Sequence, residues 1–393
     1  MQKQAVIVDA IRTPVGRGKK GGALSEVHPN DLLAHVLRAL VRRNGIDPGE
    51  VDDVIIGCVS QSGEQSAGPG RMAWLACGYP EHVPATTIDR KCGSSQQAVH
   101  FAAQGVMAGA YDIVIAGGVE SMSRVPMGSA RGDADPFGPA VRDRYAPGLV
   151  GQGVSAELVA ARWGLSRAAM DRYAANSHRR AAAVAASGGF ASEIVPVPAG
   201  NALVEADETI RPQTTAEKLS ELRPAFEDAA LGGRFPEISW SVTAGNASQI
   251  SDGAAALLIM SEAAAARLGC RPRARFAGFD VVGDDPLLML MALIPATRRV
   301  LRKAGMTTDD IAHFEVNEAF AAVPLAWQQE FGVDDARLNP CGGAVALGHP
   351  LGASGARLMA TMLNALERSG GRYGLQTMCE AGGMANATII ERL

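Results

Sequence analysis

Short apolar strands alternate with amphipathic helices at both ends of this sequence, and this alternation restricts the possible folds more than any other feature. A buried strand is predicted at 5–10, and a helix at 31–45 with Asn30 or Asp31 as its N-cap. In the same part of the chain, strands are predicted at 52–60, 86–93 and 111–118, and a further helix at 94–109. Strands that are apolar on both faces need cover on both sides of their sheet, so we expect an α/β fold.

The last third of the chain resembles the first. Residues 294–320 resemble 37–58, with Gly305 placed like Gly45 at an offset of 260. The sequence GASGARL from residue 352 resembles GSSQQAV from residue 93, and Gly382-Gly383 resembles Gly117-Gly118. Such offsets are far too long for a solenoid repeat. They predict two similar α/β halves, at 1–119 (completed by about 248–270) and at 271–393.

Residues 120–247 interrupt the repeat and have a different character. The stretch 123–148 is rich in glycine, proline and charge and predicts an extended loop. Residues 155–189 predict two helices, the second with Ser166 as its N-cap. We expect this segment to form a loop domain over the sheet, a common place for substrate binding.

Charge and hydropathy exclude several classes of protein. The net charge of −4 gives no strong attraction to nucleic acid or to an anionic membrane surface. No apolar run reaches about 18 residues, so no membrane-spanning helix is expected. The first residues do not resemble a signal peptide, and the last three do not form the usual peroxisomal signal. We therefore expect a cytoplasmic protein without nucleic-acid or membrane partners.

Cysteine spacing argues against a metal centre and against a disulfide framework. No two cysteines have the spacing of a zinc knuckle, and without an export signal disulfides are not expected. Most of the six are therefore predicted to be small buried hydrophobic residues. They are Cys58, Cys77, Cys92, Cys270, Cys341 and Cys379.

Cys92 stands apart because a predicted strand ends at it and Gly93 opens a helix. A thiol at a helix N-terminus lies at the positive end of the helix dipole, which favours the thiolate. Arg90 and Lys91 precede it and are expected to add to that effect. Cys92 is thus a candidate nucleophile, and the alternative is a cysteine that only packs in the core.

Three further clusters carry possible chemistry. His349 stands in the glycine-rich stretch 339–355, where a rigidly held imidazole suits a general base, or else is structural. Cys379 precedes Gly382 and Gly383 at a turn, where it could carry a proton beside backbone N–H donors, or simply pack. Asn317 follows a strand and could orient a water or an oxyanion, or cap a helix.

Other motifs are absent or lack their structural context. Residues 16–21 fit G-x-G-x-x-G, but no helix follows at once and no acidic ribose ligand is well placed. No G-x-S-x-G, H-E-x-x-H or phosphate-loop motif occurs.

Together the four clusters resemble the thiolase family. The matching sequences span the whole chain in order: DRKCGSSQQAV around Cys92, ELRPAF at 221–226, VTAGNASQISDGAAALL at 242–258, VNEAFA around Asn317, NPCGGAVALGHPLGASGAR around His349 and LQTMCEAGGMANATII around Cys379. The resemblance implies two similar α/β halves in five αβαβα layers, with an inserted loop domain over a coenzyme A site. It also implies a homodimer or homotetramer with residues 120–150 in any tetramer contact, acyl-CoA and CoA as ligands, and no metal or prosthetic group, since coenzyme A is a substrate.

The resemblance also implies roles for particular residues. Cys92 would carry the acyl group, His349 would take its proton, and Cys379 would exchange a proton with the α-carbon of acetyl-CoA. Asn317 would hold a water that helps His349 stabilise the enolate. The N–H groups of Cys92 and Ala381 would form the other oxyanion site. Residues that match the substrate pocket are Arg223, Ser248, Met289, Ala319, Phe320, Ala381 and Gly382.

Some positions depart from the family pattern. Ala381 replaces a common glycine, and its methyl group would crowd the pocket if the residue needed positive φ. Gly151 and Gln152 replace the histidine and methionine of acetoacetyl-specific members, and 289–296 lacks their glycines. The sequence looks more like actinobacterial thiolases that shorten longer or steroid-derived acyl chains. It therefore predicts a degradative 3-ketoacyl-CoA thiolase, with three alternatives: an acetoacetyl-CoA-forming enzyme, a carrier-protein-dependent ketosynthase, and a non-catalytic acyl-CoA-binding relative.

Overall fold

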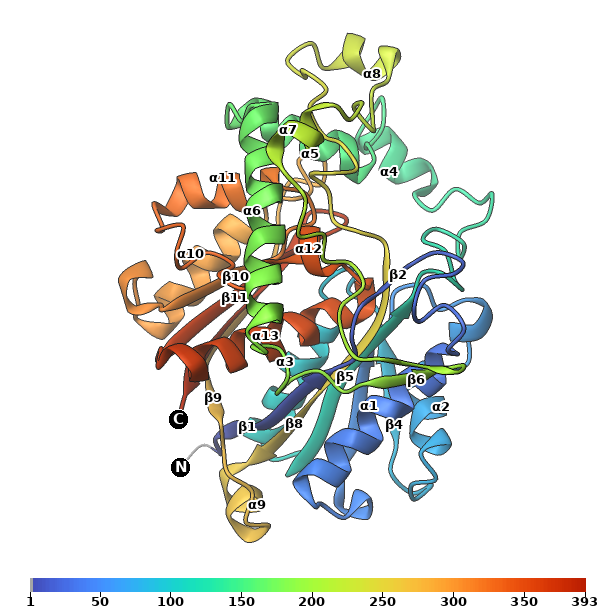
Figure 1. The fold of residues 1–393 in the computed structure, drawn as a ribbon, viewed down its shortest axis with the longest axis vertical. Helices are drawn as coiled ribbons and strands as arrows, with labels where there is room; N and C mark the ends of the chain where they lie inside the picture. The colour runs from blue at the N-terminus through green and yellow to red at the C-terminus, as the bar shows by residue number, and fades with distance from the viewer. Residues whose placement is uncertain (1–2) are drawn as a thin grey trace.

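A continuous sheet runs through the molecule, and its strand order shows two halves joined at the middle (Figure 1). The computed structural model describes residues 3–393. The order is β10-β11-β12-β9-β1-β8-β5-β3-β4, with β2 paired to β8. The strands are β1 (Ala5–Arg12), β2 (Gly16–Arg17), β3 (Asp53–Gly57), β4 (Ala85–Ile88), β5 (Ile113–Ser121), β8 (Ser251–Ser261), β9 (Ala274–Gly283), β10 (His313–Val316), β11 (Tyr373–Glu380) and β12 (Met384–Arg392). β1 and β9 share only two residue pairs, so the two half-sheets turn away from each other there.

Two helices lie between the half-sheets and others cover their outer faces. α3 (Ser94–Ala108) packs on β3 and β5, and α13 (Ser354–Ser369) contacts β1 and β8 of one half and β10 and β11 of the other. On the outside, α1 (Pro29–Asn44) and α2 (Pro69–Ala76) cover the first half, and α10 (Leu293–Ala304) covers the second. The remaining helices outside the inserted segment are α9 (Glu262–Arg267), α11 (Ala322–Phe331) and α12 (Ala344–Leu347). The 3₁₀ turns are η1 (Pro48–Glu50), η2 (Gly63–Gln65), η3 (Thr308–Asp310) and η4 (Leu351–Ala353). The layers are therefore α, β, α, β, α, as expected.

Equivalent elements of the halves start 260 residues apart: α3 at Ser94 and α13 at Ser354, β5 at Ile113 and β11 at Tyr373. Gly45 and Gly305 both end their helices in left-handed conformation, as the repeat predicts. The match of Gly117-Gly118 to Gly382-Gly383 was wrong. The first pair lies inside β5, whereas the second lies in the turn after β11.

The predicted N-cap of the first helix was also wrong, since the helix begins earlier. His28 is the cap, and its ring nitrogen accepts a hydrogen bond from the N–H of Asn30 at 3.2 Å. Proline at the first helical position favours this earlier start, because its ring fixes φ and no N–H is lost.

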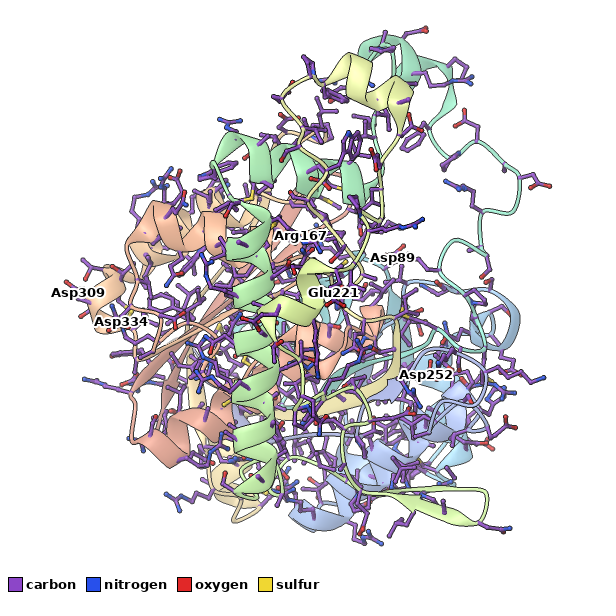
Figure 2. All side chains as sticks on the ribbon, turned by 45° about the horizontal axis from the view of Figure 1, so that its top comes forward. Asp89, Arg167, Glu221, Asp252, Asp309 and Asp334 are labelled. Carbon is purple, nitrogen blue, oxygen red and sulfur yellow. The ribbon has the colours of Figure 1, made fainter. Side chains whose placement is uncertain are left out.

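The segment between the halves carries helices and a small hairpin. Its elements are α4 (Gly138–Arg144), α5 (Gln152–Arg162), α6 (Arg167–Ala186), β6 (Val197–Ala199), β7 (Ala202–Val204), α7 (Ala216–Ser220) and α8 (Ala229–Arg234). Ser166 caps α6, as predicted. Arg167 of α6 donates to the carbonyls of Leu219 and Leu222 on either side of Glu221, which connects two parts of the segment (Figure 2). The boundaries 120–247 remain our proposed limits of this segment.

No helix within residues 3–393 combines the length and the apolar character needed to cross a membrane. No three His, Cys, Asp or Glu side chains there are grouped so that they could hold a metal ion.

A buried ion cluster attaches the inserted segment to β1. Arg12 is fully buried and donates to Glu193 at 2.6 Å and to Asp207 at 2.7 and 3.0 Å. The backbone continues this link, since Arg12 N–H donates to the Glu193 carbonyl and Val195 N–H donates to the Arg12 carbonyl. One arginine thus neutralises two carboxylates that are taken out of water.

Replacing Arg12 with methionine should destabilise the protein strongly. Two buried carboxylates would lose their counter-charge, a change that typically costs about 3–5 kcal/mol. The urea midpoint of unfolding, followed by circular dichroism, measures the loss. Arg298→Met is the matched control, because its ion pair with Glu330 is largely exposed and such pairs contribute about 0–1 kcal/mol. Equal midpoints for the two variants would contradict a structural role of the cluster.

Candidate active site

Cys92 lies in a tight turn between β4 and α3. The N–H groups of Gly93 and Ser94 donate to the carbonyls of Arg90 and Lys91, and Lys91 has a positive φ of 49°. Ser94 Oγ accepts from the Arg90 N–H at 2.9 Å and donates to the Lys91 carbonyl at 2.6 Å. The turn is therefore fixed by hydrogen bonds on both sides of the cysteine, which is 5% exposed.

The surroundings of Cys92 favour the thiol at rest, not the thiolate expected from its position at a helix start. Burial, and after it the nearby Glu380 carboxyl, raises the pKa of Cys92 to about 12. The N–H groups of Cys92 and Ala381 act in the opposite direction but more weakly. Lys91 does not supply the expected positive charge, because its ammonium group is paired with Asp89 at 2.6 Å. Desolvation outweighs the helix dipole here.

His349 is held by its main chain and by one ring nitrogen. Its N–H donates to the Gln249 carbonyl at 3.0 Å. Its Nδ1 lies 2.6 Å from Ser354 Oγ, and that hydroxyl donates to the Pro350 carbonyl at 2.8 Å. Since Ser354 has a single proton to donate, Nδ1 carries the ring proton and Nε2 keeps a free lone pair. Nε2 can then accept a proton.

Burial, with the positive charge of Arg357 behind it, lowers the pKa of His349 to about 3. The imidazole is thus neutral at rest. Asn317, just after β10, directs its side-chain amide at His349, with Nδ2 3.5 Å from Nε2. The Oδ1 atom of Asn317 is buried without a hydrogen-bond partner in residues 3–393. A buried acceptor of this kind is costly unless a ligand or a water meets it.

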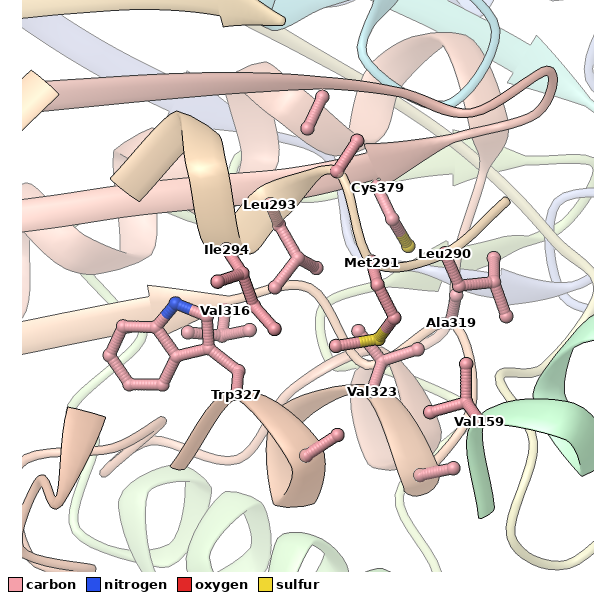
Figure 3. Close-up of a cluster of buried hydrophobic side chains, with 14 of the residues drawn as sticks. Val159, Leu290, Met291, Leu293, Ile294, Val316, Ala319, Val323, Trp327 and Cys379 are labelled. Atoms are coloured by element: carbon pink, nitrogen blue, oxygen red, sulfur yellow. The ribbon is translucent and has the colours of Figure 1, made fainter. Parts of the chain in front are cut away.

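Cys379 lies near the end of β11 in an apolar environment. It belongs to a cluster with Leu290, Met291 and Ala319, and Figure 3 shows it beside these side chains. Burial, and after it the proximity of Cys92 and of Glu380, raises the pKa of Cys379 well above its usual value. The structure thus brings the two sulfurs into one electrostatic environment, although 287 residues separate them in the sequence.

Ala381 does not have the conformation that would make its methyl group harmful. Positive φ occurs at the next two residues, Gly382 at 92° and Gly383 at 78°, but not at Ala381. Its N–H faces the Cys92 thiol, as the oxyanion role requires. The methyl group is therefore compatible with that role.

A cavity of about 610 Å³ reaches the site from the side of the inserted segment. Four predicted residues line it: Ser248, Ala319, Phe320 and His349. Met122 and Leu351 also line it and pack against Cys92, which therefore lies directly behind the cavity wall. Arg223 is exposed and Met289 packs in the cluster of Cys379, and neither is among the lining residues.

Several lining residues were not identified from the sequence. They include Arg17, Lys19, Met122, Met127, Arg211, Phe226 and Gln249. The basic run at 17–20 was a usable signal, although its glycines resemble a dinucleotide motif instead. The stretch joins the cavity because β2 pairs with the start of β8.

Comparisons with known proteins agree with this geometry. Residues 5–263 match the description "Thiolase, N-terminal domain" and residues 270–392 match "Thiolase, C-terminal domain". The chain belongs to the thiolase family.

Named thiolases are similar over almost the whole chain. Steroid 3-ketoacyl-CoA thiolase FadA6 of Mycobacterium tuberculosis is 49% identical, over 99% of this chain and 94% of the relative. A 3-ketoacyl-CoA thiolase of Erwinia tasmaniensis is 45% identical over the full length of both. The crystal structure of the Bacillus anthracis acetyl-CoA acetyltransferase superimposes with a TM-score of 0.88 at 36% identity, covering 100% of this chain and 99% of the other. This thiolase is therefore an acyltransferase.

Ser354→Ala tests whether the hydroxyl fixes the useful tautomer of His349. Without an acceptor at Nδ1, the proton can move to Nε2 and the ring can turn. We expect the reaction of Cys92 with iodoacetamide at neutral pH to slow by about tenfold to a hundredfold, as for partial loss of a general base. Ser369→Ala, at the exposed end of the same helix, is the control. Unchanged alkylation of Cys92 in Ser354→Ala would show that the loop alone fixes the ring.

Proposed function

We propose that this thiolase cleaves 3-ketoacyl-CoA with CoA, giving acetyl-CoA and a shortened acyl-CoA through an acyl-cysteine at Cys92. The observation that carries this proposal is the meeting of two buried thiols with a histidine whose Nε2 is free to accept a proton. A lone nucleophile would transfer an acyl group, but breaking a carbon–carbon bond also requires an acid for the departing carbon. Cys379 supplies that second group.

The first half of the reaction forms the acyl-enzyme. His349 takes the proton of Cys92, and the thiolate attacks the ketone carbon of the substrate. The N–H groups of Cys92 and Ala381 are placed to stabilise the oxyanion, and donors of this kind are worth about 2.7–4 kcal/mol each. The C–C bond then breaks, and its electron pair forms the enolate of acetyl-CoA, whose oxygen faces His349 and the Asn317 amide. Cys379 gives its proton to the carbanion carbon.

The second half restores both cysteines. The thiol of CoA loses its proton to the Cys379 thiolate and attacks the acyl-cysteine. Cys92 leaves as a thiolate and recovers its proton from His349. The raised pKa of Cys379 suits this exchange, because a weakly acidic thiol keeps its proton until a strongly basic carbanion forms beside it.

The cavity supports acyl-CoA as the ligand. Lys19 and Arg211 bring positive charge to its wall, which suits the phosphates of coenzyme A, whereas the guanidinium of Arg17 is paired with Glu208. Met122, Met127, Phe226, Phe320 and Leu351 give it an apolar lining suited to an acyl chain. Arg223, Ser248 and Met289 keep their predicted roles near CoA and the acyl group. No metal or prosthetic group enters the proposed reaction.

A long or polycyclic acyl group is the substrate that we favour. Gln152, which stands where acetoacetyl-specific members carry a methionine, lines the cavity, and Gly151 beside it is exposed and adds no side chain where those members carry a histidine. The relatives named for 3-ketoacyl-CoA and steroid 3-ketoacyl-CoA cleavage support this choice. The alternative is formation of acetoacetyl-CoA, supported by the similar structure named acetyl-CoA acetyltransferase.

We also propose a homodimer or homotetramer as the working assembly. Exposed Met127, Phe137 and Val141 in the loop of residues 120–150 support its place in a tetramer contact. A cytoplasmic location stays a prediction.

A chain-length series tests the proposed reaction. We expect CoA-dependent cleavage of 3-ketoacyl-CoA substrates to increase in kcat/KM from acetoacetyl-CoA to longer chains. Cys92→Ala should abolish cleavage of all of them while leaving CoA binding, measured by calorimetry, unchanged. Preference for acetoacetyl-CoA would favour the biosynthetic alternative. CoA binding without any turnover by the unmutated protein would favour a non-catalytic relative.

Ala381→Gly tests the alternative of a non-catalytic relative, because that alternative arose from the alanine at position 381. Since Ala381 has ordinary φ, we expect kcat to change by less than about twofold. Gly382→Ala is the contrasting variant, because a φ of 92° strains any residue with a Cβ, and it should lower thermal stability. A large gain of activity in Ala381→Gly would mean that the methyl group does obstruct the oxyanion site.

A further inference from the structure

Glu380 is a buried carboxyl group in the active site for which the proposed reaction has no use. It stands between Cys379 and Ala381 at the end of β11, and its side chain is fully buried. Neither carboxyl oxygen has a hydrogen-bond partner within residues 3–393. Burying such a group without partners costs several kcal/mol, so a purely structural role gives it no compensation.

The side chain of Glu380 lies against the turn that holds Cys92. A Cβ added at Gly93 would overlap its Oε1 atom, so the carboxyl group touches the backbone immediately after the nucleophile. Only glycine at position 93 leaves room for it. The contact directly connects the state of this carboxyl group to the site of thiolate formation.

The other half of the molecule has an equivalent buried carboxyl group, but there the group is fully hydrogen-bonded. Glu120 lies 260 residues before Glu380, at the equivalent place in β5, and faces Gly352 at the start of the second half's helix region. Its carboxylate accepts four hydrogen bonds, at 2.8–3.0 Å, from the N–H groups of Val59, Ser60 and Gly352 and from the Gln65 side chain. The repeat thus keeps a carboxyl group in both halves but satisfies it in only one. The unsatisfied one faces the nucleophile.

The charges around Glu380 give it little support as an anion. Arg90 is the nearby cation, yet the two form no ion pair in the described chain, and Asp89 opposes its effect. The groups that face this corner are Asp89, Arg90, Lys91 (paired with Asp89), Cys92, Glu120 and Cys379. Burial, with Asp89 partly offsetting Arg90, raises the pKa of Glu380 to about 8. The carboxyl group is thus mostly protonated at neutral pH.

We infer that Glu380 is a positioning residue that sets the upper pH limit of Cys92 reactivity, because it permits thiolate formation only while it carries its own proton. The thiolate of Cys92, the oxyanion of the attacked ketone and the enolate are all negative, and an ionised Glu380 beside them raises the free energy of each. While protonated, it fills the space behind Gly93 without charge. The inference concerns the catalytic step of the proposed function, but its first test needs no turnover.

The test compares the alkylation of Cys92 by iodoacetamide in the unmutated protein and in Glu380→Gln, with the modified cysteine identified by peptide mass spectrometry. Below about pH 7 both proteins should react at similar rates, because Glu380 is neutral in each. Above about pH 8 only the unmutated protein acquires the charge, so Glu380→Gln should react faster, on the order of tenfold by about pH 9.5. If the ratio of the two alkylation rates is the same at every pH, the inference is overturned.

Two variants serve as controls. Glu380→Asp keeps a carboxyl group and should retain slow alkylation at high pH, which a change of packing alone would not produce. Glu217→Gln removes an exposed carboxylate that does not line the cavity and should behave like the unmutated protein. If Glu380→Gln fails to fold, infrared difference spectra between the unmutated protein and Glu380→Asp decide: a carboxylic-acid band that is lost near pH 8 in the unmutated protein and altered in Glu380→Asp supports the inference, and identical bands in the two proteins refute it.

Turnover provides a second readout. The alkaline limb of kcat/KM for thiolysis should move to higher pH in Glu380→Gln, with KM nearly unchanged at neutral pH. Because CoA carries its own thiol that titrates in this range, this limb is compared between variants and not interpreted alone. Alkylation that depends on Glu380 in a protein without thiolase activity would reject the proposed function and leave this inference intact.

Discussion

The carboxylate of Glu318 holds the catalytic loop in place, and much of the active site depends on it. It is fully buried just after β10 and accepts hydrogen bonds from four donors that belong to two separate parts of the chain. These donors are Tyr173 Oη at 2.9 Å, Ser177 Oγ at 2.7 Å, Asn339 Nδ2 at 3.1 Å and the Val345 N–H at 3.0 Å. Through them one anion joins the inserted helix α6 to the glycine-rich loop that ends at His349. It lies next to Asn317, so one network positions Asn317 and His349, the two groups proposed to face the enolate.

Glu120 fixes the other end of that loop in a similar way. It connects the ends of β3 and β5 to Gly352, three residues beyond His349. Gly118 allows this approach, because a Cβ there would overlap the Gly352 carbonyl. His349 is thus fixed between two buried carboxylates that belong to different halves. Rigid placement of this kind reduces the entropy that a catalytic group must lose in the transition state.

Local patterns in the sequence predicted the regular elements and the repeat. Apolar periodicity placed α1, α3, β1 and β5 to within a few residues, and glycines marked the helix ends. The start of α1 was misplaced because a histidine side chain, a less common cap, satisfies its first turn. The motifs identified the family and the candidate residues. They could not predict the protonation states, which depend on burial created by segments more than 200 residues apart. For the same reason the sequence assigns no role to Glu120, Glu318 or Glu380, because in a sequence a carboxylate with four donors and one with none are indistinguishable.

Burial also explains how one pocket can hold two thiols without ionising either. In water, thiols near neutral pH are partly ionised, and two thiolates side by side would repel each other and any enolate. Here Cys92 and Cys379 both have raised pKa values and His349 a lowered one, so the resting site carries no charge on its reactive groups. In the proposed reaction the proton of Cys92 passes to His349 as the attack on the ketone begins, because neither the thiolate nor the imidazolium is stable alone in this environment. In that reaction the thiolate of Cys92 is scarce at rest, and charge develops where the two proposed oxyanion sites would stabilise it.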